Sequence, residues 1–139
     1  MRNNTYLENK LDAIWQTFFS DVPKDNKVSI KFGRKAAKRL GSIRKINSLN
    51  EERFDTQILI NGYFRHKNIP HFVVEATIAH ELCHYAHGFS SPLPQLSKFP
   101  HRGDVVDHEL KRRGLRELEK AENKWLNKYW YKFINNTTC

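Results

Sequence analysis

The stretch PHFVVEATIAHELCHYAHG, residues 70–88, decides how the rest of the chain is interpreted. It is apolar over most of its length, with a proline suited to the first position of a helix and a glycine suited to closing it. We therefore predict a single helix over 70–88, about five turns long. Burial of two histidines beside a glutamate in such a helix would be costly without a ligand or partner.

Within this helix, the pentapeptide HELCH places two histidines four residues apart. Side chains at that spacing share one helical face, so His80 and His84 can bind the same tetrahedral Zn²⁺. Glu81 lies beside them, where a carboxylate can take a proton from water and return it to a leaving amine. The pattern predicts one zinc ion per chain, with Glu81 as the catalytic group. The alternative is a pair of histidines with a structural role.

A catalytic zinc usually has three protein ligands and one position for water. The third ligand is expected downstream, and His101 is the first candidate because a proline-rich loop brings it back toward the helix. Glu109 and His108 are the alternatives. His87 lies about 10.5 Å from His80 along the helix axis, which is too far for both to bind one ion. We therefore expect His87 at the surface or beside a ligand.

The remaining pattern predicts an α+β protein with a small sheet packed on helices. The length, 139 residues, fits one domain over 1–139. Apolar periodicity and turn residues predict helices at 5–19, 33–41, 102–113 and 115–133, strands at 27–32, 42–46 and 55–64, and a loop at 89–100.

The net charge of +9 and the pI near 9.7 suggest a polyanionic partner such as nucleic acid. On the predicted helix at 33–41, four basic side chains would form one face: Arg34, Lys35, Lys38 and Arg39. They are the candidate nucleic-acid-binding residues. A second basic cluster consists of Lys111, Arg112, Arg113 and Arg116. The basic run beyond it, over 120–132, is interleaved with acidic residues and is interpreted as a solvated helix face.

No apolar run approaches the roughly 18 residues that span a membrane, and the N-terminal residues lack the features of a secretory signal. The two cysteines do not form a disulfide framework of the kind found in small secreted domains. We therefore expect a cytoplasmic protein, or one located in the nucleoid or nucleus if it acts on DNA.

With these motifs in place, the chain resembles the SprT-like zinc metallopeptidases, relatives of bacterial SprT and of the Spartan protease domain. The resemblance is carried by RLGSIR, TQILING, the HELCH helix and FPHRGDVVDHELKRRGL, in that order. It implies a minimal zincin-like domain with a small three-stranded antiparallel sheet over the HExxH helix. It also implies zinc ligands at His80, His84 and His101, with Glu81 as the catalytic glutamate. In PHRG, Arg102 stands where the family often has glycine.

The resemblance implies a zinc-dependent endopeptidase that hydrolyses peptide bonds. Some relatives act on proteins crosslinked to DNA, so the expected partners are a protein or peptide substrate and DNA, without a membrane. Tyr85 and nearby histidines are candidate donors to the oxyanion of the reaction. The competing hypothesis is a nucleic-acid-binding module with a structural zinc site, against which Glu81 argues because a structural site does not need it.

Overall fold

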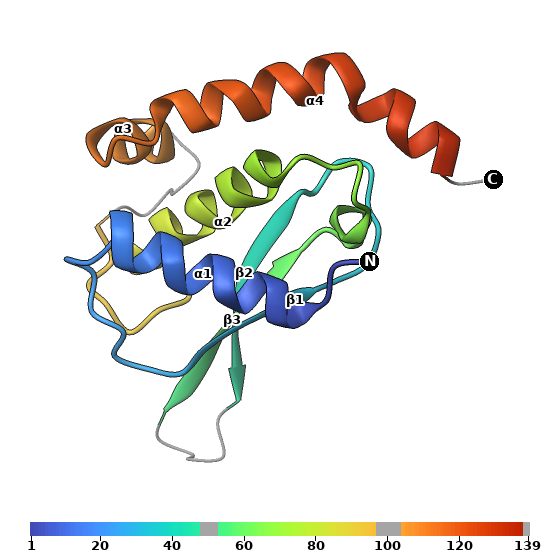
Figure 1. Ribbon diagram of the computed structural model, residues 1–139. Helices are drawn as coiled ribbons and strands as arrows, with labels where there is room; N and C mark the ends of the chain where they lie inside the picture. Colours follow the sequence, from blue (N-terminus) through green and yellow to red (C-terminus); the bar gives the residue numbers. More distant parts are fainter. Residues whose placement is uncertain (48–52, 97–103, 138–139) are drawn as a thin grey trace.

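The computed structural model describes residues 1–47, 53–96 and 104–137 (Figure 1). The fold is α+β, as predicted. In chain order the elements are α1 (Asn4–Phe18), β1 (Val28–Phe32), β2 (Gly41–Asn47), β3 (Phe54–Ile60), the 3₁₀ turn η1 (Gly62–Arg65), α2 (His71–Ala86), α3 (Val105–Arg112) and α4 (Arg116–Thr137). The third strand is therefore shorter than predicted and ends in a helical turn.

The three strands form a mixed sheet in the order β1-β3-β2, so the prediction of an antiparallel sheet was wrong. β1 runs parallel to β3, with Ile30 opposite Ile58. β2 runs antiparallel to β3, with Ile43 opposite the same residue. The cause is the segment 33–40, hereafter the linker. It carries the chain past the end of β3 to the other edge of the sheet, so β1 and β2 flank β3 and do not form a hairpin.

The predicted helix at 33–41 is absent, because its backbone groups are bonded to side chains from elsewhere. The Asn61 side chain donates to the Ala36 carbonyl at 2.6 Å and accepts from the Ala36 N–H at 3.4 Å. The Trp130 indole N–H donates to the Ala37 carbonyl at 2.7 Å. These contacts replace the internal hydrogen bonds of a helix and hold the linker in an irregular path.

The helices are arranged in two layers on one face of the sheet. α1 packs against β1, and α2 packs against β2 and β3, over buried strand residues such as Ile30, Ile43 and Ile58. The opposite face of the sheet exposes Lys31 and Arg44. α4 crosses α2 on the side away from the sheet, and α3 lies at the start of α4 (Figure 1). The result is that α2 is enclosed by other elements along most of its length.

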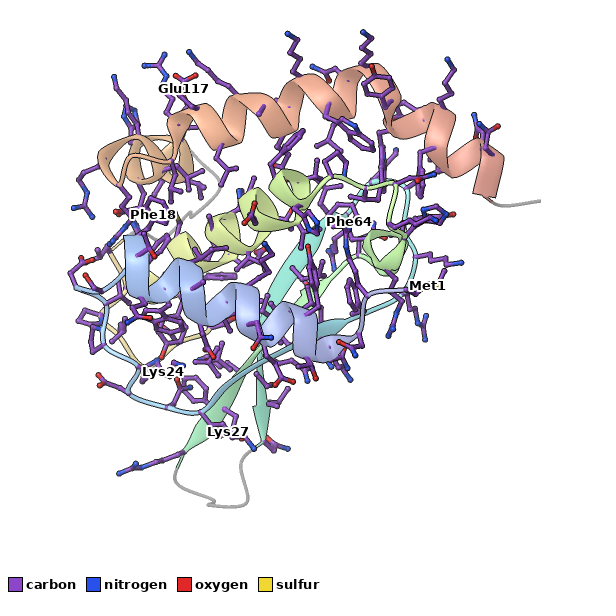
Figure 2. The ribbon with its side chains drawn as sticks, viewed as in Figure 1. Met1, Phe18, Lys24, Lys27, Phe64 and Glu117 are labelled. Carbon is purple, nitrogen blue, oxygen red and sulfur yellow. The ribbon has the colours of Figure 1, made fainter. Side chains whose placement is uncertain are left out.

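Side chains fill the space between α4 and the rest of the protein (Figure 2). Phe64 is fully buried there and meets the Trp130 ring edge-on, with ring centroids 5.7 Å apart. Trp130 also contacts Tyr63 and Phe133, both of which pack against the core. This aromatic cluster fixes the C-terminal half of α4 against η1.

Replacement of Gly41 by alanine is expected to destabilise the protein by about 1–3 kcal/mol, the usual cost of overpacking. A Cβ atom on Gly41 would lie 2.8 Å from Cγ2 of Thr77 and 3.5 Å from Cγ of Glu81. β2 would therefore have to move away from α2. The measurement is the free energy of unfolding in urea.

The matched control is Gly33→Ala, because a Cβ there would meet its neighbours only at 3.7 Å or more. We expect this variant to stay within about 0.5 kcal/mol of the wild type. Equal losses in the two variants would contradict the close contact of β2 with α2.

Candidate metal centre

The candidate centre is built on α2, whose residues are buried on nearly all sides. The chain enters through Pro70, which has an extended backbone, and leaves through Gly88, whose φ of +81° suits glycine alone. Most of the buried side chains are apolar, but three are polar: Thr77, Glu81 and His84. Such groups need partners that offset the loss of water.

The two predicted ligands face each other. The Nε2 atoms of His80 and His84 are 3.2 Å apart, and the ring centroids are separated by 4.9 Å. Two nitrogens bound to one tetrahedral zinc at 2.0–2.1 Å would be about 3.3 Å apart. The observed spacing therefore fits this metal geometry. His84 is only 2% exposed, whereas His80 is partly open to solvent.

Glu81 completes the group. One potential ligand atom from each of His80, Glu81 and His84 lies within 4.8 Å of the others, the only such cluster among the described residues. Burial raises the pKa of Glu81 to about 8, although the Arg39 charge opposes the shift and Glu122 adds to it. A cation held by the histidines would favour the ionised carboxylate. The donor set thus fits a divalent metal ion.

The predicted third ligand, His101, lies outside the described residues, as does Cys139. The two alternatives are within the described part and do not join the cluster. Glu109 is buried and directed toward His87 and toward two arginines, Arg112 at the end of α3 and Arg113 just after it. His108 is exposed and lines a separate surface cavity of about 340 Å³.

His87 belongs to a part-buried ion-pair network. Its Nε2 contacts the Glu109 carboxylate, which also accepts from Nε of Arg113 at 2.8 Å and from exposed Arg112. Arg113 in turn bonds Asp21, which follows α1. The network therefore ties α2, α3 and the end of α1 together.

The protonation of Glu109 follows from this network. Burial alone would raise its pKa, but the hydrogen bond from His87 and the charges of Arg113 and Arg112 outweigh burial and hold the pKa below its ordinary value. Glu109 is thus a structural anion that is already neutralised.

Tyr85 does not reach the site, and its suggested role as an oxyanion donor is wrong. Its side chain is fully buried, and its ring meets Trp15 of α1 edge-on. The hydroxyl donates to Oδ1 of Asn26 at 2.6 Å. Tyr85 therefore belongs to the core packing of α2 against α1.

One acidic residue near the site was missed from the sequence. Glu122 of α4 is 8% exposed and, with His80 and Glu81, lines a cavity of about 420 Å³. The sequence analysis placed it on a solvated helix face. A signal was present, because position 122 falls on the same helical stripe as Leu118 and Trp125. A carboxylate in an apolar stripe is directed inward.

The protonation of Glu122 is perturbed in the same direction as that of Glu81. Burial raises the pKa of Glu122 to about 7, and the hydrogen bond from Thr77 only partly opposes the shift. The Thr77 hydroxyl lies 2.7 Å from the Glu122 carboxylate and 2.9 Å from the Val73 carbonyl. It has one proton for two acceptors, so a protonated Glu122 that donates to Thr77 would satisfy all three groups.

The four candidate nucleic-acid-binding residues lie on the linker and do not share a helical face. All four are exposed: Arg34, Lys35, Lys38 and Arg39. Lys35 lies over the Tyr63 ring, and Lys38 borders the cavity beside Glu81. A different basic set lines a groove of about 570 Å³ beside the exposed face of the sheet: Lys31, Arg34, Arg39 and Arg44. The structure thus places two of the four predicted residues in a groove that the sequence did not predict.

Comparison with protein-family models, with curated proteins and with solved structures finds no match to this chain. No helix of the described ranges is both long enough and apolar enough to cross a membrane.

Proposed function

We propose that this protein is a zinc-dependent endopeptidase of the SprT-like type. The observation that carries the proposal is the 3.2 Å separation of the His80 and His84 Nε2 atoms, with the Glu81 carboxyl beside them. The histidine spacing suits zinc, and a glutamate adjacent to a metal is the group that peptide hydrolysis requires. A site with only a structural role would have no use for Glu81.

His80 and His84 would hold the ion, with His101 as the proposed third ligand. A bound Zn²⁺ lowers the pKa of water to about 7 and polarises a carbonyl group. Glu81 accepts a proton from the attacking water and returns it to the leaving amine. The Glu81 side chain is buried, and its position on α2 places its carboxyl group beside the two histidines.

β2 supplies a place for the substrate. It lies at one edge of the sheet, and its first residue, Gly41, lies against Thr77 and Glu81 of α2. An extended peptide can add to such an edge strand through backbone hydrogen bonds. This placement would bring a peptide bond to the entrance of the cavity that holds His80 and Glu81.

The direct test is the zinc content of purified protein. We expect about one zinc per chain in the wild type, a tenfold or greater loss of affinity in His84→Ala, and a clear loss in His101→Ala. His87→Ala is the matched control, because His87 is on the same helix but bonds Glu109. Absence of zinc from reloaded wild-type protein would overturn the proposal, and full binding by His101→Ala would exclude that residue as a ligand.

We propose nucleic-acid binding as a second function of the same chain, with DNA-bound proteins as the substrate class. It is supported by the groove lined by Lys31, Arg34, Arg39 and Arg44. Arg44 bonds Gln57, and among the described residues none of the four cations forms an ion pair with an acidic side chain. Arg39 borders both the groove and the cavity beside Glu81, so the two sites are adjacent.

Binding of a labelled oligothymidine strand tests this second proposal. The double variant Arg34→Ala/Arg44→Ala is expected to lower the slope of log affinity against log salt by about 1.4, or about 0.7 for each lost phosphate contact. Lys124→Ala/Lys132→Ala removes the same charge from exposed positions on α4 and should change the slope little. Equal effects from both pairs would mean that net charge alone causes binding.

A further inference from the structure

The cavity beside Glu81 is lined by four segments and opens to solvent. Thr77, His80 and Glu81 of α2 form one wall, the linker and Gly41 of β2 form a second, and Glu122 of α4 forms the third. Its volume of about 420 Å³ is within the range of sites that bind small groups. The cavity therefore contains two carboxyl groups, those of Glu81 and Glu122. The proposed mechanism assigns proton transfer to Glu81.

Glu122 is costly to the fold where it stands. Its side chain is buried, and its carboxyl group accepts a hydrogen bond from the Thr77 hydroxyl. No ion pair within the described ranges includes it. A buried carboxylate is stabilised when a positive charge comes close. Burial is the main cause of the raised pKa of Glu122.

The basic residues of the cavity do not supply this cation. Lys38 and Arg39 are exposed, so water and salt screen their charges. Arg39 acts on the Glu81 carboxyl, whose pKa it lowers, and it does not appear among the groups that shift Glu122. The buried end of the cavity is thus acidic, and the basic groups are confined to its opening.

We propose that this cavity is a specificity pocket that takes a lysine or arginine side chain of the substrate, with the Glu122 carboxylate as its counter-ion. The inference rests on the proposed peptidase function and adds to it the residue that selects the substrate. The side chain enters past the linker, its apolar stem lies along Leu40, and its charged end reaches Glu122. Glu122 takes no part in bond cleavage.

The test begins with a peptide library generated by cleavage after glutamate, which leaves lysine and arginine inside the peptides. The wild type should cleave with a basic residue at one fixed position relative to the scissile bond. Two synthetic peptides then differ only there, with lysine or the uncharged norleucine. We expect kcat/KM to favour lysine by about ten- to hundredfold, as for a hydrogen bond to a charged group.

Glu122→Gln keeps the shape and a hydrogen-bond acceptor for Thr77 but removes the charge. In this variant the lysine-to-norleucine ratio should fall to about 1–3, while kcat/KM for the norleucine peptide stays within about threefold of the wild type. Glu117→Gln is the control, because Glu117 is exposed on the outer side of α4 (Figure 2). Its ratio should equal that of the wild type.

The outcomes separate this inference from the function on which it rests. Cleavage with no basic preference, or a preference that survives in Glu122→Gln, would overturn the pocket and leave the peptidase standing. An equal loss of activity on both peptides would assign Glu122 to catalysis or positioning and overturn the inference. If the zinc-loaded wild type cleaves no peptide, the peptidase proposal fails and the inference fails with it.

Discussion

Glu81→Gln is expected to lower kcat/KM for peptide hydrolysis by about 10²–10⁴-fold, the usual contribution of a general acid–base group. The amide has nearly the same shape as the carboxyl but cannot accept the proton of the attacking water. Zinc binding should remain within about threefold of the wild type, because the proposed mechanism assigns the ion to histidines and not to Glu81. The measurements are steady-state kinetics and metal analysis of the same preparation.

Glu75→Gln is the matched control for this change. Glu75 lies on the same helix and pairs with Lys10 at 3.1 Å, in a part-exposed position. Its replacement should leave kcat/KM unchanged and alter stability by less than about 1 kcal/mol. If Glu81→Gln retained full activity, the peptidase mechanism would be wrong. If that variant lost its zinc, Glu81 would be a ligand.

The second large effect is expected from Glu109→Gln, which should destabilise the fold by about 3 kcal/mol. Glu109 and Arg113 are a buried pair, and removal of one charge leaves the other without its full compensation. The loss is placed at the low end of the range for buried pairs because Asp21 still bonds Arg113. The measurement is urea unfolding at pH 7, with zinc content determined in parallel.

The stability difference between the wild type and Glu109→Gln is expected to depend on pH. The pKa of Glu109 is lowered in the folded protein, so its contribution is fully present above its ordinary pKa of 4.5. It is lost as the pH falls through the folded value. The difference between the wild type and Glu109→Gln should therefore shrink in acid. A difference that grew in acid would contradict the ion-pair network.

Arg112→Ala is the control for this network. Arg112 contacts the same carboxylate as Arg113, but its side chain is 63% exposed, against 6% for Arg113. Exposed pairs contribute about 0–1 kcal/mol, so this variant should be nearly as stable as the wild type. Loss of zinc from Glu109→Gln with unchanged stability would instead restore Glu109 as a candidate ligand.

The parts of the fold that the sequence predicted are those set by local periodicity. The helical stripe from Leu7 to Trp15 and the long apolar run around HELCH were recognised because side-chain spacing alone determines them. The linker was predicted wrongly because its residues have helical propensity, whereas the bonds from Asn61 and Trp130 are tertiary. The antiparallel sheet was predicted wrongly for the same reason, since no local pattern encodes which strand lies between the other two.

In the candidate site too, the sequence predicted the local grouping of residues and missed the contacts that depend on tertiary packing. His80, Glu81 and His84 are close together because one helix carries all three, so the sequence was sufficient to group them. Glu122 comes from a helix far along the chain, and only packing brings it to the cavity. The basic groove combines all three strands with the linker and depends on the strand order. His101, outside the described residues, stays a prediction.

The parallel pairing of β1 with β3 has a consequence for how the chain is made. α1 and β1 leave the ribosome before β3, so β1 cannot form its parallel pairing until β3 has been synthesised. β2 and β3 pair locally and can form an early hairpin, whereas the pairing of β1 waits for a distant segment. During that interval the apolar stripe of α1 is uncovered. Exposed apolar surface of this kind favours aggregation until the later elements cover it.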